Sequence, residues 1–138
     1  MTVFKKSITG FLSLVSILFG SNAIANDVEV VNAQFKRDTN DTWTISVTLL
    51  HKDRGWDHYA DKWRIVDSQE NIITERVLLH PHDKEQPFER SRNDVRIPAG
   101  VSILFVEAHD KVHGWNEKKL EIDLSKVNKA GHLTVSAD

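Results

Sequence analysis

The sequence contains no cysteine, and its single methionine is the first residue. The absence of cysteine excludes disulfides, thiolate zinc sites, thiol catalysis and blue-copper centres. A soft Cu(I) site built on methionine is excluded from the body of the chain as well. A domain without these cross-links must be held together by the packing of its core.

An excess of positive charge is also missing. The 138 residues include 18 Lys+Arg and 20 Asp+Glu, which gives a formal net charge of −2. Nucleic acids and anionic membrane surfaces are bound by strongly basic surfaces. We therefore expect neither as a partner.

The chain has only one long apolar run, and it lies at the start. Lys5 and Lys6 precede an apolar stretch over residues 8–19, and Ala23 and Ala25 form a small-x-small cleavage pattern. The stretch is too short for a membrane span. We interpret residues 1–25 as a secretory signal peptide and residues 26–138 as a single domain. This predicts a periplasmic or secreted protein with no membrane insertion after cleavage.

From residue 26 onward, short apolar segments alternate with turn residues. The clearest pattern places Trp43, Ile45, Val47 and Leu49 on one face of a strand, which is typical of a half-buried antiparallel strand. His51 continues this inward-facing series. Further strands are expected at 28–35, 63–67, 72–80, 94–98, 101–108, 118–124 and 132–135. About seven antiparallel strands in this length predict an all-β fold, an immunoglobulin-like or fibronectin-III-like sandwich.

Histidines gather at one end of this predicted sandwich. If successive strands reverse direction, the loops 52–62, 81–93 and 110–117 lie together, and loops at one end of a sandwich commonly carry function. Six of the 7 histidines belong to these loops or to the strand ends beside them: His51, His58, His80, His82, His109 and His113.

The segment 76–91, RVLLHPHDKEQPFERS, contains the densest group of titratable side chains. Pro81 separates His80 from His82 and restricts the backbone on both sides, so the two histidines flank a rigid corner. A basic run follows, and nearby acidic residues predict that its members form ion pairs at the base of the loop. These basic residues are Arg90, Arg92 and Arg96.

Three motifs carry a resemblance. They are WDHYAD at residues 56–61, RVLLHPH followed by EQPF at residues 76–88, and AHD followed by HGW at residues 108–115. Together they resemble a family of small exported bacterial proteins of unassigned function. The resemblance covers nearly all of the chain after the signal peptide. It implies a bacterial, periplasmic location and no particular activity.

Imidazole and carboxylate groups at one place are the ligands of Zn(II) and Cu(II). We therefore predict an exported binding protein whose six loop histidines supply a divalent metal site. For any single histidine, a hydrogen bond to loop backbone is the simpler explanation. The argument for metal depends on the convergence of several ligands.

The alternative is a binding module for a glycan, another small ligand or a protein partner, in which the histidines are structural. Trp56, Tyr59 and Trp115 would form its aromatic platform, although tryptophans near strand ends also pack over the core. Polar side chains of the same loops would complete this surface: Asp57, Glu85 and Asp110.

Catalysis has less support in the sequence. His58 with Asp57 or Asp61, and His109 with Asp110, have the composition of acid–base pairs. No nucleophile motif of the G-x-S-x-G type is present. We therefore expect binding rather than an enzymatic reaction.

Overall fold

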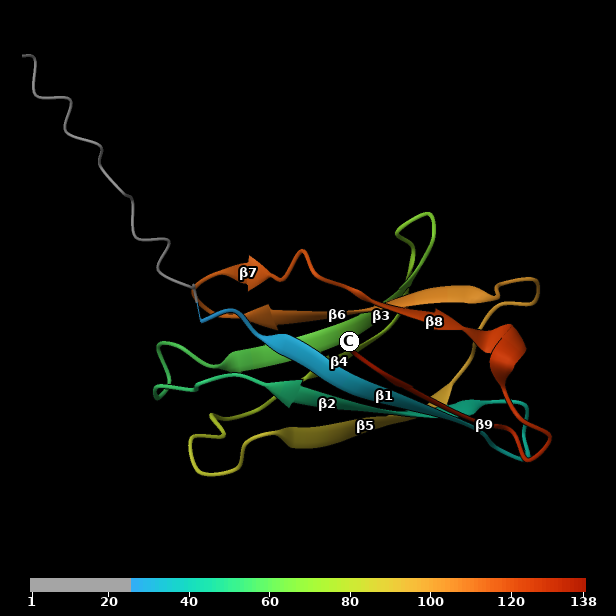
Figure 1. Cartoon of the computed structure of the whole chain (residues 1–138), viewed down its shortest axis with the longest axis horizontal. Helices are drawn as coiled ribbons and strands as arrows, with labels where there is room; N and C mark the ends of the chain where they lie inside the picture. The colour runs from blue at the N-terminus through green and yellow to red at the C-terminus, as the bar shows by residue number, and fades with distance from the viewer. Residues whose placement is uncertain (1–25) are drawn as a thin grey trace, which may run out of the picture.

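A computed structural model describes residues 26–138, so the predicted signal peptide lies outside the described residues. The chain forms two antiparallel sheets that face each other (Figure 1). The first sheet has the order β5-β2-β1-β9, and the second has the order β4-β3-β6-β7 with β8 also paired to β6. The strands of the first sheet are β1 (Glu29–Arg37), β2 (Trp43–Leu50), β5 (Phe88–Val95) and β9 (His132–Ser136). Those of the second are β3 (Ala60–Asp67), β4 (Ile72–Val77), β6 (Ile103–Asp110), β7 (Gly114–Trp115) and β8 (Leu120–Asp123).

This architecture confirms the predicted all-β sandwich. The first, second and fifth strands share one sheet, and the third, sixth and eighth share the other, as in the immunoglobulin arrangement. One difference is that β4 pairs with β3 rather than with β5. The only helical element of residues 26–138 is the 3₁₀ turn η1 (Leu124–Lys126). No helix in this part of the chain combines the length and the apolar character that a membrane crossing requires.

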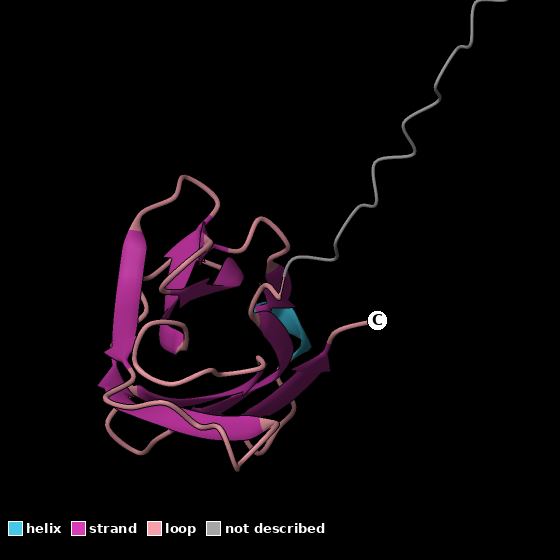
Figure 2. Cartoon of the chain, turned by 90° about the vertical axis from the view of Figure 1, so that its left-hand side faces the viewer, coloured by secondary structure: helices cyan, strands magenta, loops and turns pink. Residues whose placement is uncertain are grey.

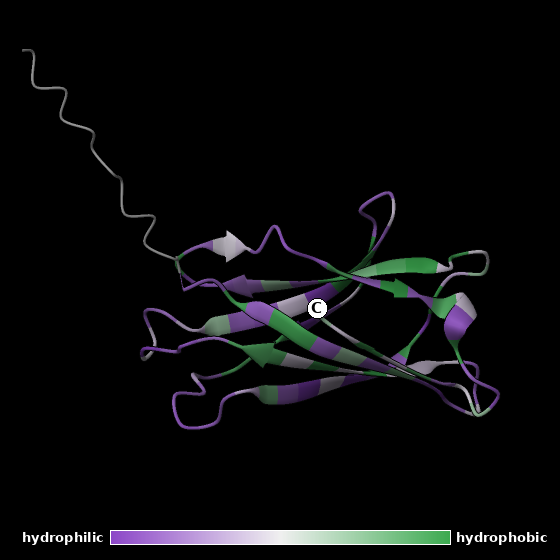
Figure 3. Cartoon of the chain, viewed as in Figure 1, coloured by the Kyte–Doolittle hydropathy of each residue, from purple (hydrophilic) through white to green (hydrophobic). Residues whose placement is uncertain are grey.

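The core lies between the sheets and follows from the alternation along the strands. Trp43, Ile45, Val47 and Leu49 of β2 are all buried, as predicted, and Trp63 of β3 is fully buried opposite them. Figure 3 shows the hydrophobic residues concentrated along the strands and hydrophilic residues in the loops at both ends. Burial of each large apolar side chain stabilises the fold by about 1.5–3 kcal/mol.

Several predicted strands have different boundaries in the structure, among them the fifth and the fourth, which flank the β4–β5 loop. The fifth strand spans Phe88–Val95 rather than 94–98, and only these two terminal residues of it are buried. Because β5 is an edge strand with polar residues between its ends, its sequence resembles a loop. The fourth strand ends at Val77 rather than at residue 80, although the Leu78 N–H still donates to the Asp61 carbonyl at 2.8 Å.

The loops β2–β3, β4–β5 and β6–β7 lie at the same end of the sandwich, at the left of Figure 1. Figure 2 looks onto this end and shows the loops around the opening between the sheets. The start of the described chain lies at this end as well, because the Asn26 side chain donates to the Lys52 carbonyl of the β2–β3 loop at 2.8 Å. The up-and-down order of strands therefore brings the histidine-bearing loops together.

Candidate metal centre

His51 and Asp110 come from different sheets and meet because each continues the buried face of its strand. His51 lies two residues after Leu49, and Asp110 lies two residues after Ala108 on β6, so their side chains have the inward direction. His51 is 1% exposed and Asp110 is 0% exposed. An imidazole and a carboxylate therefore point into the end of the core between the sheets.

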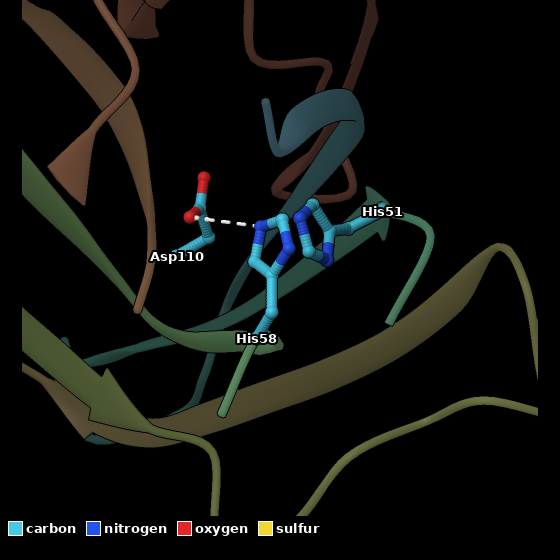
Figure 4. Close-up of side chains that lie close together, drawn as sticks. All are labelled: His51, His58 and Asp110. Carbon is cyan, nitrogen blue, oxygen red and sulfur yellow. Dashed lines mark ion pairs between the residues drawn. The ribbon is translucent and has the colours of Figure 1, made fainter. Parts of the chain in front are cut away.

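His58, from the β2–β3 loop, lies against this pair. Its ring centroid is 4.8 Å from that of His51, and its Nε2 is 3.3 Å from Oδ1 of Asp110 (Figure 4). The ring is also 5.1 Å from His113, so three imidazoles form a row at the end of the core.

His113 and Asp27 complete the group from the other side. Nδ1 of His113 lies 3.1 Å and 3.2 Å from the two carboxylate oxygens of Asp110, and 3.4 Å from Oδ1 of Asp27. There are two sets of potential ligand atoms, and within each set all atoms lie within 4.8 Å of one another. One set comes from His51, His58 and Asp110, and the other comes from Asp27, His113 and Asp110. We call these five residues the Asp110 cluster.

The Asp110 carboxylate is held as an anion. Burial acts to raise the pKa of this group, but the backbone N–H groups of His113 and Val112 donate to it and bring its pKa below the ordinary value. These two hydrogen bonds to Oδ1 measure 2.7 Å and 2.9 Å. They also cap the β6–β7 turn, and among residues 26–138 Oδ2 has only the His113 ring as a partner. A buried anion attracts a cation.

Both ring nitrogens of His51 face oxygen atoms. Nδ1 lies 2.5 Å from Oδ1 of Asp53, and Nε2 lies 2.9 Å from the carbonyl oxygen of Asn26. A carboxylate on one nitrogen is the arrangement that orients a metal-binding histidine. A metal ion would reach Nε2 only by replacing the Asn26 carbonyl, so His51 is the least accessible ligand of the cluster.

Asp53 is a residue of this site that was not predicted from the sequence. Oδ1 accepts from the His51 ring and from the Ala60 N–H at 3.0 Å, and Oδ2 accepts from the His82 N–H at 2.7 Å. This one buried carboxylate therefore joins the end of β2, the start of β3 and the β4–β5 loop. The signal that marks it is its spacing, because it lies two residues after His51 and continues the same inward series.

The two histidines of the proline corner do not join the Asp110 cluster. The ring of His82 stacks on Phe88 with centroids 3.9 Å apart, and neither ring nitrogen has a hydrogen-bond partner in residues 26–138. Burial lowers the pKa of His82, and the positive charges of Arg90 and His80 lower it further. His80 is exposed, and its Nδ1 lies 2.9 Å from the Pro81 carbonyl oxygen.

His109 also lies apart from the cluster, because it has the outward direction on β6. Its Nδ1 is 2.5 Å from Oδ1 of Asp61, and its ring meets the Trp115 ring edge-on at 5.0 Å. The Arg64 guanidinium covers the Trp115 ring at 3.8 Å from the centroid. The Trp115 ring therefore packs against His109 and Arg64 on the outer face of the second sheet.

The proposed aromatic platform is divided in the structure. Trp56 is 65% exposed and packs against Tyr59 with centroids 5.8 Å apart, whereas Tyr59 itself is buried. No ring contact joins Trp115 to these two side chains within the described part of the chain. Two of the polar residues expected beside them, Asp57 and Glu85, are exposed.

Comparison with known proteins gives one partial likeness. A protein of Halomicrobium mukohataei titled "Putative lipoprotein" is 37% identical over 78 residues, which are 56% of this chain. The matched stretch spans only 38% of that relative's own length. No described protein family matches the sequence, and no solved structure matches it.

Proposed function

We propose that this protein is an exported binding protein that holds a divalent transition-metal ion, Zn(II) or Cu(II), at the Asp110 cluster. The observation that carries the proposal is that two imidazole nitrogens from different loops, Nε2 of His58 and Nδ1 of His113, lie 3.3 Å and 3.1 Å from one carboxylate oxygen of Asp110. Convergence of this kind is what a metal site requires.

Placement in the cell envelope is part of the proposal. The signal-peptide pattern over residues 1–25 supports export. The lipoprotein title of the Halomicrobium mukohataei relative points in the same direction.

The two ligand sets that we propose share Asp110, which is joined by His51 and His58 on one side and by His113 and Asp27 on the other. Nitrogen and carboxylate oxygen donors without sulfur suit Zn(II) and Cu(II). Asp27 and His113 line a surface hollow of about 390 Å³, which gives an ion access from solvent. His51, fixed by Asp53, would enter the coordination shell on release of the Asn26 carbonyl.

Calorimetric titration with Zn(II) and Cu(II) tests this function. We expect saturable binding with a Kd below about 10 µM, and a loss of at least about tenfold in affinity for His58→Ala and for His113→Ala. Affinity should also fall as the pH is lowered, because protons compete with the metal for imidazole nitrogens. The matched control is His80→Ala, which removes an exposed histidine outside the cluster. Absence of saturable binding, or an equal loss in His80→Ala, would remove the metal proposal.

A second candidate function is binding of a glycan or a protein through Trp56. Its large exposed ring, braced by Tyr59, has the form of an aromatic contact site. A glycan array read with wild type and with Trp56→Ala tests it. Signals that the substitution abolishes would support glycan binding at Trp56, and absent or unchanged signals would exclude glycan binding there.

A further inference from the structure

The three arginines of the basic run have different surroundings. Arg90 pairs with Glu85 through Nη2 and Oε2 at 3.4 Å and donates to the Glu89 carbonyl at 2.7 Å. Arg92 and Arg96 form no ion pair within residues 26–138. The predicted neutralisation of the basic run therefore applies to Arg90 only.

Arg92 and Arg96 line a hollow of about 690 Å³ together with Arg76 of β4. The strands β4 and β5 are edges of opposite sheets, so the hollow lies where the sandwich is open at its side. The neutral polar side chains of Thr74, Ser91 and Asn93 also line it. Asp94 is the only acidic residue among those that line the hollow, so three arginines and one acid contribute to it.

Arg76 adds an independent observation. Its Nε is buried and has no hydrogen-bond partner among residues 26–138. In the described part of the chain its Nη1 makes only a long contact, of 3.4 Å to the Val77 carbonyl. A buried N–H without an acceptor is costly, so an acceptor supplied by a ligand would be strongly favoured here.

We propose that Arg76, Arg92 and Arg96 form an arginine groove that binds an anionic ligand carrying two or more phosphate, sulfate or carboxylate groups. Guanidinium groups match these oxyanions because their N–H donors are arranged as a planar fork. The volume of the hollow exceeds what one small anion fills, and three separate cations suit a ligand with several charges. The arginine groove shares no residue with the Asp110 cluster, so the two proposals stand independently.

Titration of the metal-free protein with pyrophosphate and with citrate at low ionic strength tests the arginine groove. We expect saturable binding of at least one probe, weakened about tenfold by Arg92→Gln and about tenfold by Arg96→Gln. Both residues are exposed, so the fold is retained. Preference for pyrophosphate would assign phosphate or sulfate groups to the ligand, and preference for citrate would assign carboxylates.

Arg90→Gln is the matched control, because it removes an arginine of the same strand that already has a carboxylate partner and does not line the hollow. We expect its affinity for the probe to stay within about twofold of wild type, since only distant and screened charge is lost. Absence of saturable binding of both probes would overturn the proposal. An equal loss of probe affinity in Arg90→Gln and Arg92→Gln would also overturn it. The probe would then be attracted by the overall positive charge of the strand and not by the arginine groove.

Discussion

Two histidine–aspartate pairs of this protein have the same contact distance and different surroundings. Nδ1 of His51 lies 2.5 Å from Asp53 with both side chains 0% exposed, and Nδ1 of His109 lies 2.5 Å from Asp61 with side chains 20% and 18% exposed. The first pair points into the end of the core, and the second lies on the outer face of the second sheet. Water can replace a lost partner in the outer pair but not in the inner one. We therefore expect burial, rather than contact distance, to set the contribution of each pair to stability.

The largest effect is expected for Asp53→Ala. It removes the partner of His51 and the acceptor of the Ala60 and His82 backbone N–H groups, all in a buried position. We expect the free energy of unfolding to fall by about 3–5 kcal/mol, as for a buried pair that loses one member. Urea denaturation followed by tryptophan fluorescence measures it. A loss below about 1 kcal/mol would contradict the central role of Asp53.

Glu107→Gln tests whether burial matters independently of side-chain direction. Glu107 has the outward direction of His109 and is nevertheless buried. Its carboxylate accepts from Nε of Arg64 and Nζ of Lys119, each at 2.6 Å. Since hydrogen bonds to charged groups contribute about 1.5–3 kcal/mol, we expect a loss of this size at pH 7 in the urea-unfolding free energy.

The pH dependence of the same substitution gives a second measurement. Burial acts to raise the pKa of Glu107, but Lys119 and Arg64 outweigh it, so its pKa lies below the ordinary value of 4.5. The unfolded chain therefore binds this proton first, and the contribution of Glu107 is lost as pH falls below about 4.5 through the folded pKa. Wild type and Glu107→Gln should converge in stability at acid pH. Curves that stay parallel would contradict this assignment.

A smaller effect, limited to mildly acidic pH, is expected at His82. Burial, followed by the charges of Arg90 and His80, lowers its pKa below the ordinary value of 6.5. Because the unfolded state binds the proton more readily, His82 destabilises the fold as pH falls below about 6.5. His82→Phe keeps a ring against Phe88 and removes the titrating group. The unfolding midpoint of this variant should therefore change less than that of wild type between about pH 7.5 and about pH 5.5. The control is His132→Gln, which removes an exposed histidine of β9 that does not contribute to the shift at His82. A slope unchanged in His82→Phe would refute the assignment.

The smallest effect is expected for Asp61→Asn. The pair with His109 is partly exposed, so we expect a change in unfolding free energy of at most about 1 kcal/mol. Measured beside Asp53→Ala in the same urea titration, this substitution completes the comparison. A loss equal to that of Asp53→Ala would show that burial does not distinguish the two pairs.

The sandwich was predictable from sequence where strands have one buried and one exposed face. The series of Trp43, Ile45, Val47 and Leu49 defined β2 and gave His51 its inward direction. The edge strand β5 was not predictable in the same way, because it buries only Phe88 and Val95. Its sequence lacks the alternation that a half-buried strand shows.

The candidate site was predictable only in outline. The order of the strands predicted at which end of the sandwich the site lies. Which residues belong to the Asp110 cluster depends on side-chain direction within β6. The series Leu104, Val106 and Ala108 is buried and continues to Asp110, which places His109 on the opposite face. The spacing of Asp53, two residues after His51, indicates its inward direction. Its partners could not have been predicted from sequence, because its contacts join three segments that are close only after folding.

The strand β5 has a consequence for the behaviour of many copies together. Within residues 26–138 it is an outer strand that pairs only with β2. Its register shifts between Arg92 and Val95, where Asp94 has a left-handed backbone with φ 55°. Exposed charges at Glu89, Arg92 and Asp94 occupy the same strand. A strand from a second molecule would have to follow this irregular backbone and cover those charges. This edge therefore opposes sheet-to-sheet polymerisation when the protein is concentrated.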